Sequence, residues 1–294
     1  MPSSTTTNRS PTSTPDFPAL KGNSPDPFSK KGAGPTSTMW SSGTQGVWAD
    51  YVIRDNVIRD QPLLPIYKPL NIESFNINSL RGKFLDIHAH LFTSCPDIFC
   101  MQETKLSSNI IDNFMLDNYV LIRSDRNSNG GGLAIYIRDS LLPTSYSIKH
   151  DLQGSEIQVV NFSFHNLKCA IINVYKPPNI LYSDFSDNLV TVMSDISSQV
   201  DYFFVAGDVN ICHLPLKNKS HSNQCQYIKN SLSAFDLAQI IESPTHILPK
   251  SSSLIDIMYI PNSLLSNYYT ELLHPIEKYH KGVRVTLHLP ITNV

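Results

Sequence analysis

The sequence of 294 residues lacks the features that would assign it to a membrane or secreted class. No apolar run approaches the ~18 residues that a membrane span needs, which excludes a membrane-spanning helix. The first residues, MPSSTTTNRSPTSTP, hold no apolar segment of the kind found in a secretory signal peptide, so we expect none. The five cysteines form no CxxC pair, which argues against a disulfide framework and against a cysteine zinc site. We therefore expect an intracellular protein with free thiols in a reducing compartment.

Charged residues are also scarce, at 16% of the chain, and the formal net charge is −2. Such a balance gives no support to broad electrostatic binding of nucleic acid. The charge is unevenly divided, because residues 1–70 hold 7 Lys or Arg and 5 Asp or Glu, whereas residues 71–294 hold 16 and 20. The acidic excess therefore belongs to the second part of the chain.

The first part of the chain is dominated by small polar residues and proline. Ser, Thr, Pro and Gly account for 29 of residues 1–46, and the apolar residues there are isolated. A segment of this composition buries too little surface to offset the entropy lost on ordering. We expect a disordered Ser/Thr/Pro-rich head and extended lead-in over 1–70, followed by one folded domain over 71–294.

Short apolar runs and helical spacing alternate from Asn71 onward. Helices are predicted over 83–94, 107–116, 183–200 and 222–237. The strand-like runs occur in pairs and meanders between these helices, which is not the strict rhythm of a parallel sheet. About ten short strands and four helices indicate an α/β fold in which two packed mixed β-sheets are flanked by helices, a four-layer α/β sandwich.

Polar residues interrupt or end the apolar strand-like runs, where a core would not favour them. These residues are Asn76, Asn78, Glu103, Tyr175, Asp208, Asn210 and Asp256. Strand ends are places where a rigid scaffold can point side chains into a shared cleft. Carboxylate and amide oxygens suit hard cations such as Mg²⁺ and Mn²⁺. Taken singly, each residue also has a structural explanation as a turn residue, a helix-terminal acid or, for Asp256, a buried partner in an ion pair.

Taken in order, the same segments form a far more specific pattern. The segments are NINSLRGK, MQETKL, INVYKPP, GDVN, SPTHI and SLIDIMYI. This series resembles the endonuclease/exonuclease/phosphatase superfamily over Asn71 to Ile291. The segments SDRNSNGGG and VYKPP are most similar to the endonuclease domain of non-LTR retrotransposons, which is abasic-endonuclease-like. The resemblance implies a DNase I-like sandwich and a DNA-nicking phosphodiester hydrolase that uses Mg²⁺ or Mn²⁺, with the nucleus as the place where such an enzyme meets genomic DNA.

The resemblance also implies a role for each motif residue. Glu103 would be a metal ligand, and Asn76 would bind the scissile phosphate or help to hold the metal. Tyr175 would donate a hydrogen bond to the phosphate. Asp208 would orient or deprotonate the attacking water, with Asn210 beside it. These roles are chemically sensible, because phosphodiester hydrolysis needs a cation and donors aimed at the phosphate oxygens, and a base for the water.

The last motif of the family, Ser-Asp-His, is incomplete in this chain. The buried Asp256 would pair with a late histidine, and two candidates follow it, His280 after Tyr279 and His288 after Leu287. A loop followed by a final strand fits His280 better, so we choose it. In either alignment the aspartate is absent, which removes a negative charge from the site and predicts weaker metal binding with reduced or lost turnover.

Arg81, Arg126 and His246 are the predicted substrate contacts, although a solvated helix start explains Arg81 equally well. Two other functions stay open. One is a catalytically decayed module of the same fold that binds nucleic acid or a partner. The other is a hydrolase of phospholipids or inositol phosphates, which the retrotransposon-like segments disfavour. DNA is the expected partner, and the sequence implies neither a membrane nor an obligate protein partner.

Overall fold

The computed structural model describes residues 67–148, 152–214 and 219–290. The helices in these ranges are α1 (Leu80–Ser94), α2 (Tyr182–Ser197) and α3 (Lys219–Ser233), with short 3₁₀ helices η1 (Asp139–Leu141) and η2 (Asn262–Leu264). The strands are β1 (Tyr67–Asn76), β2 (Ile98–Gln102), β3 (Tyr119–Ser124), β4 (Leu133–Arg138), β5 (Thr144–Ser145), β6 (Glu156–Phe164), β7 (Leu167–Tyr175), β8 (Tyr202–Asp208), β9 (Leu237–Gln239), β10 (His246–Leu248), β11 (Ser251–Ser253), β12 (Asp256–Pro261), β13 (Tyr268–Leu273) and β14 (Gly282–Pro290). Among the described residues, no helix has both the length and the apolar character to cross a membrane.

Two six-stranded sheets form the body of the domain. Their strand orders are β13-β14-β1-β2-β4-β3 and β5-β6-β7-β8-β12-β9, and β10 and β11 make a separate hairpin. Each sheet contains one parallel pair, β1–β2 in the first and β7–β8 in the second, among antiparallel neighbours. Parallel neighbours need a crossover connection, and α1 and α2 provide the two crossovers.

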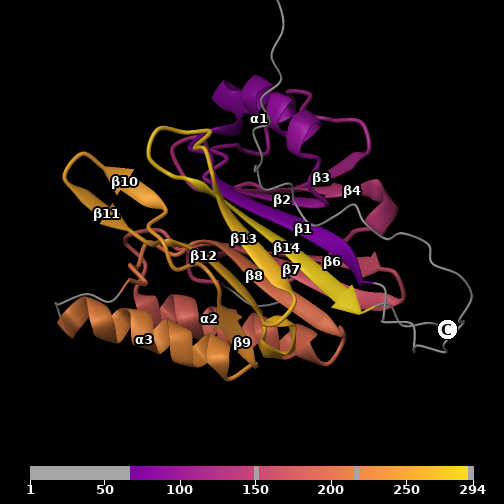
Figure 1. Cartoon of the computed structure of the whole chain (residues 1–294). Coiled ribbons are helices and arrows are strands. Elements are labelled where there is room, and N and C mark those ends of the chain that lie inside the picture. Colours follow the sequence, from indigo (N-terminus) through magenta and orange to yellow (C-terminus); the bar gives the residue numbers. More distant parts are fainter. Residues whose placement is uncertain (1–66, 149–151, 215–218, 291–294) are drawn as a thin grey trace, which may run out of the picture. The chain divides into compact units, whose positions relative to one another are not determined.

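The alternation of side chains along the strands creates three cores and four layers. Ile171 and Phe204 point into the core between the sheets, whereas the neighbouring Ile172 and Val205 point outward to α2 and α3. On the other sheet, Phe75 packs outward against α1. Figure 1 shows α1 over one sheet and α2 and α3 beneath the other, with the β10–β11 hairpin projecting to one side. The four-layer sandwich with two mixed sheets is therefore confirmed.

The helix predicted over 107–116 is wrong, because this segment is an irregular loop. The guanidinium of Arg123 donates to the carbonyl oxygens of Ser107 and Ile110, and these contacts compete with helical hydrogen bonds. The apolar side chains also fail to share one face, since Ile111 is 93% exposed while Phe114 is buried. Tertiary contacts thus override a helical sequence pattern here.

The predicted disordered head falls mostly outside the described residues, since residues 1–66 are not among them. Strand β1 begins at Tyr67, so the last residues of the predicted lead-in form the start of the first sheet. The boundary that we placed after residue 70 stays a prediction.

Candidate active site and metal centre

Asn76, the last residue of β1, joins the two sheets where their strands end. Its side-chain amide nitrogen donates to Glu103 Oε1 at 2.8 Å and to Asp208 Oδ2 at 2.9 Å. Glu103 directly follows β2 of the same sheet, whereas Asp208 ends β8 of the opposite sheet. The ends of both parallel strand pairs therefore contribute side chains to one place, which is what the sequence pattern of polar strand ends predicts.

The backbone turns sharply behind these side chains. Asn78, Glu103 and Asn210 have left-handed φ angles of 45°, 53° and 51°. Residues other than glycine rarely adopt this conformation, and they gather where a fold aims side chains for function. The site side chains hold two of the turns themselves, since Asn76 Oδ1 accepts the N–H of Asn78 and Asp208 Oδ1 accepts the N–H of Asn210.

Gly207 allows Asp208 to reach this position. Its φ is +144°, and a Cβ atom there would lie 1.9 Å from the carbonyl oxygen of Val174 on the neighbouring strand. No side chain fits between β7 and β8 at this point. The glycine of the GDVN segment is therefore required by the close approach of two strands, in addition to any role in the turn.

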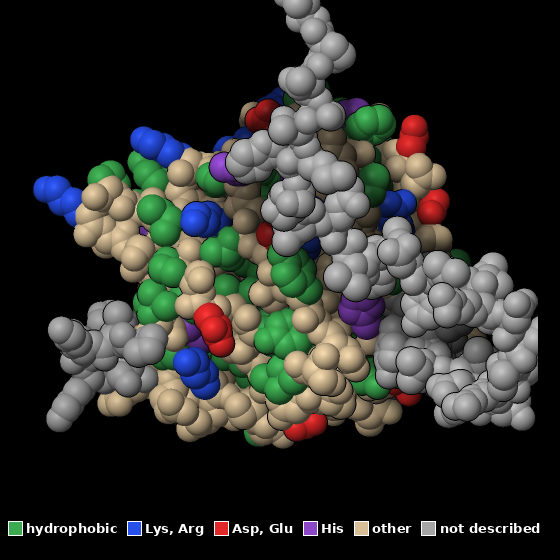
Figure 2. Space-filling model, viewed as in Figure 1, with side chains coloured by type: hydrophobic (Ala, Val, Ile, Leu, Met, Phe, Trp, Pro, Cys, Tyr) green, Lys and Arg blue, Asp and Glu red, His purple; other side chains and the backbone are tan. Residues whose placement is uncertain are grey.

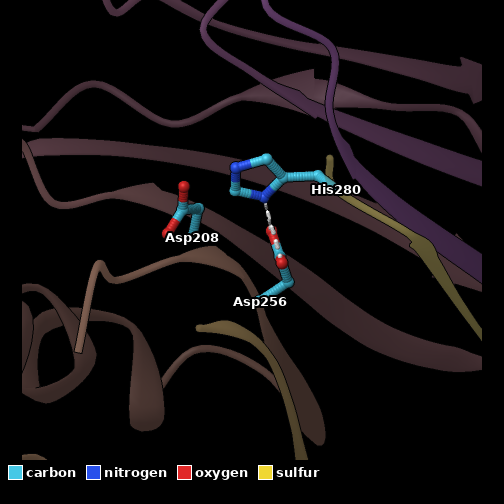
Figure 3. Close-up of side chains that lie close together, drawn as sticks. All are labelled: Asp208, Asp256 and His280. Carbon is cyan, nitrogen blue, oxygen red and sulfur yellow. Dashed lines mark hydrogen bonds and ion pairs between the residues drawn. The ribbon is translucent and has the colours of Figure 1, made fainter. Parts of the chain in front are cut away.

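Asp208, Asp256 and His280 lie close together and are all of residue types that can ligate metal ions (Figure 3). One ligand atom from each residue lies within 4.8 Å of the others. The antiparallel pairing of β8 and β12 places Asp256 opposite Asp208, and His280 Nδ1 lies 3.1 Å from both carboxylate oxygens of Asp256. The backbone N–H of Asp256 donates to Thr245 Oγ1 at 3.1 Å, which fixes the start of β12.

Burial and charge set the protonation of this group. Burial and the negative charge of Asp256 raise the pKa of Asp208 to about 7, although His280 and Asn76 act to lower it. Burial acts to lower the pKa of His280, but the hydrogen bond to Asp256 and the charges of Asp256, Asp208 and Glu277 raise it to about 9. These shifts favour the imidazolium form of His280 and make Asp208 easier to protonate than an ordinary aspartate.

Tyr175 and Asn210 complete the centre of the site. Burial, followed by the charges of Glu103 and Asp208, raises the pKa of Tyr175, which also hydrogen bonds to Glu103. The phenol therefore stays protonated and can donate. Asn210 Nδ2 donates to the backbone oxygen of Lys176 at 3.0 Å, so this amide joins the loops that follow β7 and β8.

The predicted substrate-contact arginines lie in ion pairs with acidic residues. Arg81 lies in the exposed first turn of α1 and pairs with Asp112, with Nε 2.6 Å from Oδ2. Arg126 Nη1 lies 2.6 Å from Glu156 Oε1 and is more exposed than its partner. Both arginine side chains are exposed, and their role in substrate binding stays a prediction.

Of the three histidines named from the sequence, His288 lies apart from the other two. His246 of β10 lies beside His280, with ring centroids 4.5 Å apart and a β-bridge between the two residues. His288 instead lies on β14 between two buried leucines and points to the exposed face of that strand. The geometry thus brings His280 and His246 to the site, and among the contacts of the described residues His288 has none with Asp256.

Side-chain amides connect the two sheets directly behind the site. Gln102 Nε2 donates to Asn173 Oδ1 at 2.7 Å across the sheet interface, and Asn173 Nδ2 donates to Gln158 Oε1 at 3.3 Å. Gln102 precedes Glu103, and Asn173 lies two residues before Tyr175. This buried network fixes the separation of the sheets and hence the spacing of the site side chains.

Sequence reasoning missed Thr245 and Glu277. Thr245 lies within the SPTHI segment, directly before His246, and its hydroxyl accepts the backbone N–H of Asp256, which follows 11 positions later. Glu277 lies three residues before His280 in a loop, yet it is only 6% exposed. An acidic residue in a loop is normally solvated, so its burial could not be anticipated.

A family model described as the endonuclease/exonuclease/phosphatase family matches residues 74–224. The chain belongs to this family of nucleases and phosphatases. The family assignment made from the sequence motifs is thereby confirmed, and so is the DNase I-like fold.

Individual relatives agree with that assignment. An exodeoxyribonuclease of Bacillus subtilis is 25% identical over 195 residues, which cover 61% of this chain and 76% of the relative. Among solved structures, a 3′-5′ exonuclease from Neisseria meningitidis matches with a TM-score of 0.62 and 17% identity, covering 75% of this chain and 100% of the other. The endonuclease domain of TRAS1, a telomere-specific non-LTR retrotransposon, matches with a TM-score of 0.59 and 15% identity, covering 76% and 99%.

Proposed function

We propose that this chain is a divalent-metal-dependent phosphodiester hydrolase that nicks DNA and is of retrotransposon origin. The observation that carries the proposal is the convergence of Asn76, Glu103, Tyr175, Asp208 and the Asp256–His280 pair from both sheets. Family membership and the names of the similar proteins, which act on DNA or come from a retrotransposon, support it.

The donor set fits a hard cation. Three carboxylates contribute to the site: Asn76 donates to Glu103 and Asp208, and His280 pairs with Asp256. Oxygen-rich sites of this kind select Mg²⁺ or Mn²⁺ over softer metals. Burial, and then the negative charge of Asp256, raise the pKa of Asp208, and a nearby cation would favour its ionised form. Glu103 and Asn76 are the residues proposed to hold it, and the bound ion would stabilise charge on the phosphate oxygens.

The remaining groups supply proton transfer and hydrogen bonds. Asp208 accepts a proton from the attacking water while its Oδ1 stays fixed by the N–H of Asn210. The imidazolium of His280, held by Asp256, donates to a phosphate oxygen, and the neutral phenol of Tyr175 donates to another. These donors face the charge that builds as the phosphodiester is attacked.

The substrate strand would be held by local contacts and not by a broad basic surface. Figure 2 shows Lys and Arg side chains scattered among other side chains on the part of this face that is not grey. Arg81, Arg126 and His246 are the proposed contacts at the rim.

The five cysteines are all free, which supports the proposed reducing, intracellular location, with the nucleus as the site of genomic DNA.

One observation favours a second function, a decayed module of the same fold that binds nucleic acid without cutting it. Tyr279 stands where the family pattern has an aspartate, so the site has lost one negative charge. Salt-dependent DNA binding without nicking would support this function.

A supercoiled-plasmid nicking assay with Mg²⁺ or Mn²⁺ tests the leading proposal. We expect metal-dependent conversion to the open circular form by the wild-type chain and a loss of roughly 10²–10⁴-fold in Asp208→Ala, which lacks the base. Asp187→Ala, an exposed acid on α2, is the matched control and should nick at the wild-type rate. Wild-type protein that binds DNA but never nicks it contradicts the hydrolase and favours the binding module.

A further inference from the structure

The loop between β13 and β14 carries the residue that departs from the family pattern. The ring of Tyr279 lies beside that of His246, with centroids 6.3 Å apart, and Lys278 Nζ lies 5.0 Å from the Tyr279 ring centroid. The backbone oxygen of Tyr279 accepts the N–H of Ile247 in the β10–β11 hairpin. Position 279 thus holds the hairpin in place and brings no negative charge to the site.

Glu277 brings a carboxylate into the same loop. It is one of the few buried acids among the described residues, with 6% of its surface exposed. Its Oε1 accepts the backbone N–H groups of both Tyr279 and His280. A buried carboxylate is costly unless it is well paired, so these two bonds compensate for part of its lost hydration. The bonds also fix the backbone from which the His280 side chain extends.

The charge of Glu277 reaches several groups around the site. After Asp256 and Asp208, it helps to raise the pKa of His280 against the effect of burial. Burial and His280 lower the pKa of His246, and Glu277 weakly opposes that shift. Burial lowers the pKa of Lys83 and the charge of Glu277 opposes this shift; Lys83 Nζ donates to the backbone oxygen of Asn78 at 2.7 Å. Glu277 is therefore electrostatically connected both to the histidine pair and to the turn that follows β1.

We propose that Glu277 replaces the aspartate absent at position 279, as a positioning residue that holds His280 against Asp256 and restores the missing negative charge beside the metal site. The inference rests on the proposed metal-dependent nicking. The role of the absent aspartate then falls to a residue two positions earlier in the loop. The glutamate side chain reaches the backbone N–H of His280, while Tyr279 contacts the β10–β11 hairpin. On this basis the departure from the family motif is compensated, and the site is competent.

The test separates charge from hydrogen bonding. Glu277→Gln keeps a carbonyl oxygen for the two backbone N–H groups and removes only the charge. We expect kcat for plasmid nicking to fall roughly 10–100-fold, a size typical of one interaction that aids the transition state. Glu277→Asp keeps the charge on a shorter side chain and should nick faster than Glu277→Gln, whereas a role in loop structure alone predicts the reverse order. Glu242→Gln, an exposed acid, is the matched control.

Introducing the aspartate of the family pattern at position 279 tests whether Glu277 replaces it. In the Glu277→Gln background, Tyr279→Asp should raise the nicking rate roughly tenfold. In the wild-type background the same substitution should change the rate by less than about threefold, because the effects of coupled sites are not additive. Equal effects of Tyr279→Asp in both backgrounds would overturn the inference, and so would a Glu277→Gln variant that nicks at the wild-type rate.

Metal binding gives a readout that does not need turnover. We expect Mn²⁺ to raise the melting temperature of the wild-type chain, and to raise that of Glu277→Gln less at the same concentration. A wild-type chain that neither nicks nor gains stability with Mn²⁺ overturns the proposed function and this inference with it. A wild-type chain that does both, with an identical response in Glu277→Gln, overturns the role of Glu277 alone.

Discussion

Asn76 and Asp208 lie 132 positions apart in the chain and on different sheets, yet the amide nitrogen of Asn76 donates to Asp208 Oδ2 over 2.9 Å. The same nitrogen donates to Glu103. One neutral side chain therefore separates two carboxylates at the junction of the sheets. The arrangement links the packing of the sandwich directly to the geometry of the site.

Replacement of this amide tests that link. Asn76→Ala leaves two carboxylates without a shared donor, and we expect it to lower the free energy of unfolding by about 1–3 kcal/mol in urea titrations. Asn76→Asp adds a third carboxylate, so its stability should increase with Mn²⁺ more than that of the wild-type chain. Asn188→Ala, which also removes two donated hydrogen bonds but lies on α2, should lose stability without any change in the Mn²⁺ response.

The two late histidines offer a paired test of the site. We expect His280→Ala to lower the rate of plasmid nicking by roughly 10²-fold or more, because the cationic donor beside Asp256 is lost. His288→Ala removes an exposed histidine from β14 and should nick normally. Equal loss in both variants, with unchanged circular dichroism, would contradict the assignment of His280.

His213 should make the fold sensitive to acid. It is 4% exposed, its Nδ1 hydrogen bonds to the backbone oxygen of Ile211, and burial lowers its pKa to about 4 from an ordinary value of 6.5. The unfolded chain thus binds a proton more readily than the folded chain. The stabilisation is fully present above pH 6.5 and is lost as the pH falls toward 4, with a total change of about 3 kcal/mol.

The measurement compares urea unfolding at pH 7 and pH 4.5 for the wild-type chain and for His213→Leu. The wild-type chain should lose more stability than the variant between these pH values, and His288→Leu should behave as the wild-type chain does. Identical pH dependence in all three proteins would contradict the lowered pKa of His213 in the folded chain.

Substitution by alanine should have opposite effects on stability at Gly207 and at Gly82. Gly207→Ala places a methyl group against the carbonyl oxygen of Val174 in a positive-φ conformation, so we expect a loss of several kcal/mol or no folded protein. Gly82 lies in α1, where the nearest atom to an added Cβ is 3.8 Å away. Gly82→Ala should raise the free energy of unfolding by roughly 0.5–1 kcal/mol. Thermal unfolding of both variants checks this contrast.

Much of the fold and part of the site could be predicted from local sequence. Apolar runs that end in Asn76, Glu103, Tyr175 and Asp208 already mark strand ends with chemical side chains, because a strand exposes its polar residues where pairing stops. The four-layer arrangement follows from strands with two apolar faces and helices with one. The helix predicted over 107–116 was wrong because Arg123, distant in sequence, takes the carbonyl groups that a helix would use.

The sequence by itself determined which residues could carry chemistry and in what order they occur, since residue type and strand periodicity are local properties. The sequence favoured His280 over His288, but only the tertiary structure decided that His280 contacts Asp256, and that Glu277 is buried and accepts the backbone N–H of His280. Both outcomes depend on how the β13–β14 loop folds back against the β10–β11 hairpin and β12. Contacts between segments far apart in the chain set that path, and no pattern within the loop specifies it.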